Sequence, residues 1–212
     1  MINKLSDYTA SQSHLKLVMI LYKYRSLEKF ERVVDALLFN RMFAAPFLDL
    51  NDPMEGRYVY PSSKSRGKTI IKRLKVNADY RVLSLSRTPA NTLMWSHYAS
   101  QHTGVAIGVE LESGVEAKKV KYVKDLTRVG LALKGHRRAI RLLTRKHEFW
   151  KYEKEYRVIL KNKTFVSVKP IELKLGVQIP AHTEEMIREL VDKICPNVTV
   201  DRIRKRDLDV VG

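Results

Sequence analysis

The chain has 212 residues, of which 44% are hydrophobic and 30% charged, a composition typical of a folded globular protein and not of a disordered one. Its 40 Lys and Arg residues outnumber its 23 Asp and Glu residues, so the formal net charge is +17. Such an excess of positive charge favours an anionic partner, and nucleic acid is the commonest one. The length predicts a single domain spanning residues 1–212.

Cysteine content and hydropathy limit the cellular compartments in which the protein is expected. Cys195 is the only cysteine, which excludes a disulfide within the chain and indicates a reducing environment. The longest apolar run, residues 17–22, is too short to span a bilayer, and the first residues lack the apolar run of a signal peptide. We therefore expect a cytoplasmic protein without a membrane partner.

Hydrophobic periodicity predicts the elements of the first half of the chain. An apolar strand is expected at residues 15–24, followed by an amphipathic helix at 26–40 with Ser26 as its N-cap. A short apolar segment at 42–47 leads into turn residues at 51–53. A polar loop is then expected at 61–68 and a short basic helix at 70–76.

The second half of the chain mixes strands and helices. Strands are expected at 81–86, 104–111, 120–123, 155–160, 165–174 and 198–200. Helices are expected at 91–100, at 126–149 as the longest one, and from an N-cap at Thr183 onward. Because strands and helices do not alternate regularly, the pattern predicts an α+β fold with a mostly antiparallel sheet and flanking helices.

The most informative segment is acidic and basic at once, Trp150 to Arg157. If it is extended, Glu153, Glu155 and Arg157 share one strand face. Arg157 would keep one carboxyl ionised and the other could have a raised pKa, which suits general base work or the stabilisation of a cation. Spacing alone favours the alternative, a solvated face with salt bridges.

Two further clusters could bind a cofactor. On a helix, Trp95, Tyr98 and Ala99 share one face, which could stack on a base or a nicotinamide ring, although such stripes are more often core. The turn at Asn51 and Asp52 could bind a ribose hydroxyl or a cation, although turn capping is the ordinary role of such residues.

A basic cluster could bind phosphates. On the helix expected at 126–149, Arg137, Arg141 and Arg145 recur every fourth residue, with Arg138 and Lys146 beside them. A solvated helix face is the alternative. Like charges at this spacing destabilise a helix, however, which favours a functional stripe.

Four motifs in this order resemble domain of unknown function 2971, a family of bacteria and their phages. They are residues 21–25; residues 51–55; residues 94–99 followed by 104–108; and Lys146 with Trp150, Glu153, Glu155 and Arg157. The resemblance covers roughly residues 20–160 and makes the last of these motifs a functional candidate.

The motif order is also similar to that of ADP-ribosyltransferases, above all those that modify nucleic acid. This resemblance implies an ADP-ribosyltransferase-like fold, NAD as substrate without a metal, and a toxin or phage-defence setting with an antitoxin or regulatory protein as partner. Tyr24 or Arg25 would stand at the early NAD-holding position, with Asn51, Asp52, Trp95 and Tyr98 also around NAD. Glu153 or Glu155 would stabilise the sugar cation, as carboxylates do in glycoside chemistry.

Two alternatives stay open at this point. One is a metal-dependent nuclease that would use Asp52, Glu55, Glu153 and Glu155 around magnesium. The other is a nucleic-acid-binding protein without catalysis, in which the same acids are structural.

Overall fold

A computed structural model describes residues 19–52, 57–61, 69–73, 80–126 and 135–209. A nine-stranded sheet organises them, with the path β13-β12-β7-β1-β6-β11-β8 and with β2 and β3 joined to β12 and β6. The strands are β1 (Leu21–Arg25), β2 (Arg41–Phe43), β3 (Ala45–Pro46), β6 (Tyr80–Ser86), β7 (Val105–Leu111), β8 (Lys118–Lys119), β11 (Glu155–Lys161), β12 (Phe165–Leu175) and β13 (Thr199–Arg202).

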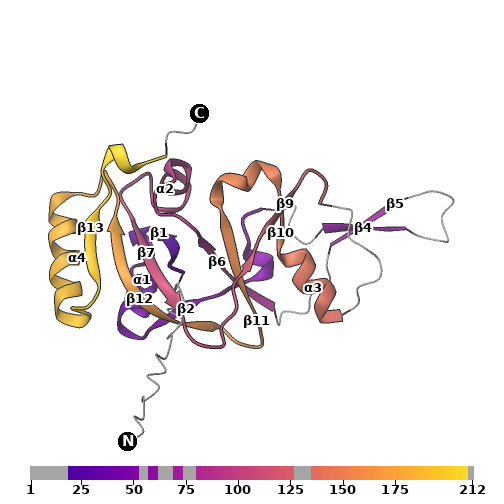
Figure 1. The fold of residues 1–212 in the computed structure, drawn as a ribbon, viewed down its shortest axis with the longest axis horizontal. Coiled ribbons are helices and arrows are strands. Elements are labelled where there is room, and N and C mark those ends of the chain that lie inside the picture. The colour runs from indigo at the N-terminus through magenta and orange to yellow at the C-terminus, as the bar shows by residue number, and fades with distance from the viewer. Residues whose placement is uncertain (1–18, 53–56, 62–68, 74–79, 127–134, 210–212) are drawn as a thin grey trace, which may run out of the picture.

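Neighbouring strands of this sheet are antiparallel, except that β13 runs parallel to β12. The predicted α+β fold with a mostly antiparallel sheet is confirmed. Two small sheets lie apart from the large one. They are the hairpin of β4 (Arg57–Pro61) and β5 (Thr69–Arg73), which projects at one end in Figure 1, and the parallel pair of β9 (Lys121–Val123) and β10 (Arg145–His147).

Helices cover both faces of the sheet. On one face, α1 (Glu31–Leu38) and α4 (Ala181–Ile194) bury Val33, Leu37 and Val191 in the main core. On the other face, α2 (Thr92–Tyr98) buries Trp95 against Tyr24 of β1. The remaining helical segments are η1 (Leu27–Lys29), η2 (Phe47–Asp49), α3 (Gly135–Leu143), η3 (Glu148–Glu153) and η4 (Lys205–Asp207).

The alternating side-chain directions of β1 explain how one strand contacts the helices on both faces of the sheet. Successive side chains of a strand point to opposite faces. Leu21 accordingly lies in the main core, and Tyr24 lies in the cluster under α2. In the described part of the chain, no helix combines the length and apolar character needed to cross a bilayer.

Several element predictions are wrong in detail. The helix expected at 126–149 is α3 alone within the described residues, and the chain then turns into β10 because its backbone pairs with β9. Residues 69–73 form a strand, not a helix. Pro180, not Thr183, precedes the first turn of α4, and the helix expected at 26–40 is η1 followed by α1. Of the polar loop expected at 61–68, Pro61 ends β4, and residues 62–68 lie outside the described residues.

Candidate functional site

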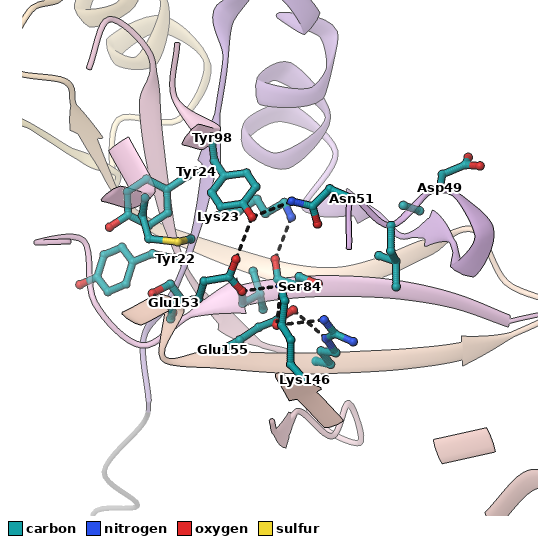
Figure 2. Close-up of a pocket in the computed structure, with 16 residues that line it drawn as sticks. Tyr22, Lys23, Tyr24, Asp49, Asn51, Ser84, Tyr98, Lys146, Glu153 and Glu155 are labelled. Carbon is teal, nitrogen blue, oxygen red and sulfur yellow. Dashed lines mark hydrogen bonds and ion pairs between the residues drawn. The ribbon is translucent and has the colours of Figure 1, made fainter. Parts of the chain in front are cut away.

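A cavity of about 210 Å³ opens where β1 and β6 separate. The two strands pair through Tyr22 and Ser86, and farther along the same edge β6 pairs with β3 through Val82 and Ala45. Between these pairings, Ser84 and Leu85 of β6 border the cavity. The residues that line it come from eight elements and one loop (Figure 2): Tyr22, Lys23, Tyr24, Ala45, Asp49, Leu50, Asn51, Ser84, Leu85, Ser86, Met94, Tyr98, Lys146, Glu153, Glu155 and Arg157.

The first carboxylate of the cavity, Glu155, is held by Arg157. The Arg157 Nε and Nη2 atoms donate to the two Glu155 carboxylate oxygens at 2.7 and 2.9 Å. Both residues lie two apart on β11, so they share one strand face as the sequence predicts. Their side chains are buried, and Arg157 Nη1 also donates to the Leu143 carbonyl. The solvated-face alternative is therefore wrong at these positions.

The second carboxylate, Glu153, ends η3 and joins the same cavity. Its Oε2 accepts from Lys146 Nζ at 2.6 Å, and its Oε1 accepts from the Tyr98 hydroxyl at 2.7 Å. The backbone here is fixed from both sides, because Ser86 Oγ donates to the Glu153 carbonyl and Lys154 adopts a left-handed conformation with φ 46°. Glu153 is thus the last residue of a helical turn and does not lie on β11, so the strand face expected for Glu153, Glu155 and Arg157 holds only for the last two.

The two carboxyl groups differ in acidity. Burial raises the pKa of Glu155, but the charges of Arg157 and Lys146 outweigh it and hold that pKa at about 2. Burial also raises the pKa of Glu153, and Lys146 counteracts this only in part, so the net direction is upward. Two neighbouring carboxyl groups whose environments move their pKa values apart are the usual mark of an acid–base site.

A lysine that the sequence analysis did not single out also faces the cavity. Lys23 lies between two tyrosines on β1, and its Nζ donates to the Ser84 carbonyl at 2.8 Å (Figure 2). Burial, helped by the nearby positive charge of Arg25, lowers the pKa of Lys23 to about 7. A charged residue between two aromatic residues of a strand was the available signal for it.

The predicted cofactor residues fall into two groups. Tyr24, Asn51 and Tyr98 line the cavity, and Asn51 Nδ2 donates to the Tyr98 hydroxyl at 2.7 Å (Figure 2). The other three do not line it, namely Arg25, Asp52 and Trp95.

Trp95 packs as core instead of facing the cavity. Its side chain has no exposed surface, its Nε1 donates to the Pro89 carbonyl, and its ring meets Tyr24 edge to face at 5.1 Å. Trp95 therefore packs against Tyr24 on the side away from the cavity. At this residue the aromatic stripe is part of the core, as the alternative interpretation expects.

The predicted phosphate-binding stripe is divided by the fold. Arg137 and Arg141 are exposed on α3, with Arg138 half-buried beside them. Arg145 lies on β10, where its guanidinium donates to the Asp125 carbonyl, and Lys146 is buried against Glu153. The stripe of three arginines at helical spacing is wrong because the helix ends at Leu143.

The residues of the nuclease alternative do not form a metal centre in the described part of the chain. Asp52 is outside the cavity, and Glu55 lies outside the described residues. Glu153 and Glu155 are already paired with cationic side chains. No group of three or more His, Cys, Asp or Glu side chains could share a metal ion among the residues described.

A comparison with protein-family models, with curated proteins and with solved structures finds no match to this chain. Its similarity to domain of unknown function 2971 and to ADP-ribosyltransferases stays a prediction from the sequence.

Proposed function

We propose that this chain transfers ADP-ribose from NAD to nucleic acid, with Glu153 as the reacting carboxylate. The observation that carries the proposal is a buried carboxyl with a raised pKa, Glu153, beside a second carboxyl that is kept ionised, Glu155. Both border one cavity with Tyr24 and Tyr98. A carboxylate next to a sugar stabilises an oxocarbenium-like transition state.

The size of the cavity defines what would enter it. Its volume of about 210 Å³ is below the roughly 300–1,000 Å³ of pockets that enclose a whole drug-sized ligand. It suits one ring system with part of a sugar, which is the reactive end of NAD. Tyr24, Tyr98 and Asn51 offer ring faces and hydrogen-bonding groups to that end.

The proposed reaction needs one group that takes up a proton. The bond from the ribose C1′ to the nicotinamide nitrogen breaks, and nicotinamide leaves as a neutral molecule. An oxygen or nitrogen of the acceptor then bonds to C1′, and its proton passes to Glu153. A raised pKa suits Glu153 to this step, whereas the pKa of about 2 makes Glu155 a poor proton acceptor.

The two carboxylates can be separated by experiment. Labelled NAD is incubated with DNA or RNA, with and without EDTA. Glu153→Gln should lower label transfer about 100-fold or more, the usual contribution of a general base. Glu184→Gln is the matched control, because Glu184 of α4 pairs with Arg188 of the same helix and with Arg202 of β13, and it does not line the cavity.

Glu155→Gln should act mainly on stability, since it leaves Arg157 buried without its carboxylate partner. Its thermal unfolding is measured beside its activity. Absence of label transfer with every nucleic acid tried would reject the proposal. Full activity of Glu153→Gln would reject the assigned residue, and nucleic-acid cleavage abolished by EDTA would support the nuclease instead.

A further inference from the structure

Aromatic rings and arginines alternate on the outer face of β2 and the start of β12. Along β2, Arg41 and Phe43 point to the same side, and Phe43 lies opposite Phe165 of β12. Val166, the residue after Phe165, is buried in the main core, so Phe165 is on the solvent side. We define the aromatic–arginine ladder as Arg32, Phe39, Arg41, Phe43, Arg81 and Phe165.

The members of the ladder contact one another in sequence. The Arg41 guanidinium lies 4.9 Å from the centre of the Phe39 ring and 4.2 Å from that of Phe165. Phe165 meets Phe43 edge to face at 6.0 Å. The guanidiniums of Arg32 and Arg81 lie 3.7 and 5.5 Å from the Phe43 ring centre, which closes the series.

The ladder remains accessible despite these contacts. Phe39 is 57% exposed and Phe165 36% exposed, and the Arg41 side chain is 43% exposed. Arg41 also pairs with Asp35 at 2.8 Å, which offsets part of its charge and fixes its orientation. Two exposed cations lie near its Phe165 end, Lys161 as the last residue of β11 and Lys163 in the turn that follows.

This combination fits the bases and phosphates of an unpaired strand. Bases stack on aromatic rings and on guanidinium planes, and cations beside them neutralise phosphates. A regular duplex keeps its bases stacked on one another, so it could use the cations but not the rings. An acidic protein surface would use the charges and gain little from ring planes.

The ladder also leads to the candidate site. Ala45, which lines the cavity, follows Phe43 by two residues, a separation of about 7 Å in an extended chain. Arg81 links the two regions, because its Nη1 donates to the Ala44 carbonyl.

We infer that the aromatic–arginine ladder binds single-stranded nucleic acid and delivers one nucleotide to the edge of the cavity at Ala45, next to the space proposed for the reactive end of NAD. The delivery step rests on the proposed function, whereas the binding step does not. The substrate class is therefore an unpaired strand, and the ladder that binds it is distinct from the exposed arginines of α3.

Fluorescence anisotropy without NAD tests the binding step. A labelled 12-nucleotide DNA or RNA strand and the matching duplex are titrated with the full chain at low and at high salt. We expect tighter binding of the single strand, and a preference that persists at high salt because stacking is less screened than charge. Phe39→Leu combined with Phe165→Leu should weaken single-strand binding on the order of tenfold and leave duplex binding unchanged.

Phe149→Leu is the matched control, because Phe149 is 79% exposed on η3 and lies outside the ladder. Arg137→Gln with Arg141→Gln on α3 should weaken single-strand and duplex binding equally, since phosphate contacts do not distinguish them. Thermal unfolding of each variant shows whether it is folded. Equal binding by the wild type and the folded Phe39→Leu/Phe165→Leu variant would overturn the inference, as would equal affinity for strand and duplex. Binding without label transfer would reject only the proposed function.

Discussion

Four charged side chains in a row define the site at the scale of single residues. The Lys146 Nζ atom lies 2.6 Å from Glu153 Oε2 and 3.5 Å from Glu155 Oε2. Glu155 also forms an ion pair with Arg157. All four side chains are at most 4% exposed. Removing one partner of such a buried pair leaves an uncompensated charge, which costs about 3–5 kcal/mol. The network therefore fixes its carboxylates in place before any ligand binds.

Lys23 makes the stability of the fold depend on pH. Its pKa is about 7 in the folded chain and 10.5 in the unfolded one, so unfolding takes up a proton between these values. The burial penalty is complete below pH 7 and is relieved as pH rises toward 10.5. Between pH 7 and 9 the free energy of unfolding of the wild type should rise by about 2 kcal/mol relative to Lys23→Met.

Urea unfolding at several pH values between 6.5 and 9.5 measures this difference. Lys169→Met serves as the control, because Lys169 is 67% exposed and should leave the pH dependence as in the wild type. Identical pH profiles for Lys23→Met and the wild type would show that Lys23 titrates normally.

At the scale of elements, one asparagine ties together the two segments that carry Tyr98 and Glu153. Asn91 Oδ1 accepts from the Met94 amide and so caps α2, while its Nδ2 donates to the Tyr152 carbonyl of η3. Asn91 itself is buried. The bond between Tyr98 and Glu153 therefore depends on a residue that does not line the cavity.

Asn91→Ala should lower the free energy of unfolding by about 1–2 kcal/mol through loss of the cap, with a further loss from the unpaired Tyr152 carbonyl. Asn91→Ser restores a capping oxygen but does not reach η3, so its stability should fall between the two. Chemical denaturation of the three proteins tests this order. Equal stability of the serine and alanine variants would mean that the cap contributes nothing.

Local sequence pattern was sufficient to predict several of the elements. The capped helix at α2 and the strands β6, β7, β11 and β12 follow from their caps and apolar periods. In the sequence, Arg145 continues the four-residue spacing of Arg137 and Arg141, which predicted a helix. Its backbone instead pairs with β9, more than twenty residues earlier in the chain. Periodicity within a short window contains no information about such pairing.

At the scale of the whole molecule, net charge is the dominant property. With a formal charge of +17, the folded chain repels itself. Most exposed ion pairs, such as Lys193 with Glu189, contribute too little to offset this. Added salt screens both the repulsion between like charges and the attraction within exposed ion pairs, and the repulsion is the larger of the two.

Raising the NaCl concentration from about 20 to 300 mM should therefore raise the Tm by about 2–4 °C, equivalent to roughly 1 kcal/mol for a chain of this size. Differential scanning fluorimetry measures the change. Replacing the exposed Lys161 and Lys163 by Glu lowers the net charge and should reduce the rise. A Tm that falls with salt would mean that attractive pairs dominate the surface.

The sequence by itself determined the α+β class, the mostly antiparallel sheet, the positive charge and the shared face of Glu155 and Arg157, because composition and local period carry that information. Only the tertiary structure decided which side chains meet. It placed Lys23 and Lys146 at the carboxylates and moved Trp95 into the core. It also joined Phe39, Phe43 and Phe165 into one surface. The physical reason is that these contacts join residues far apart in the chain, through strand pairing and burial that no local pattern specifies.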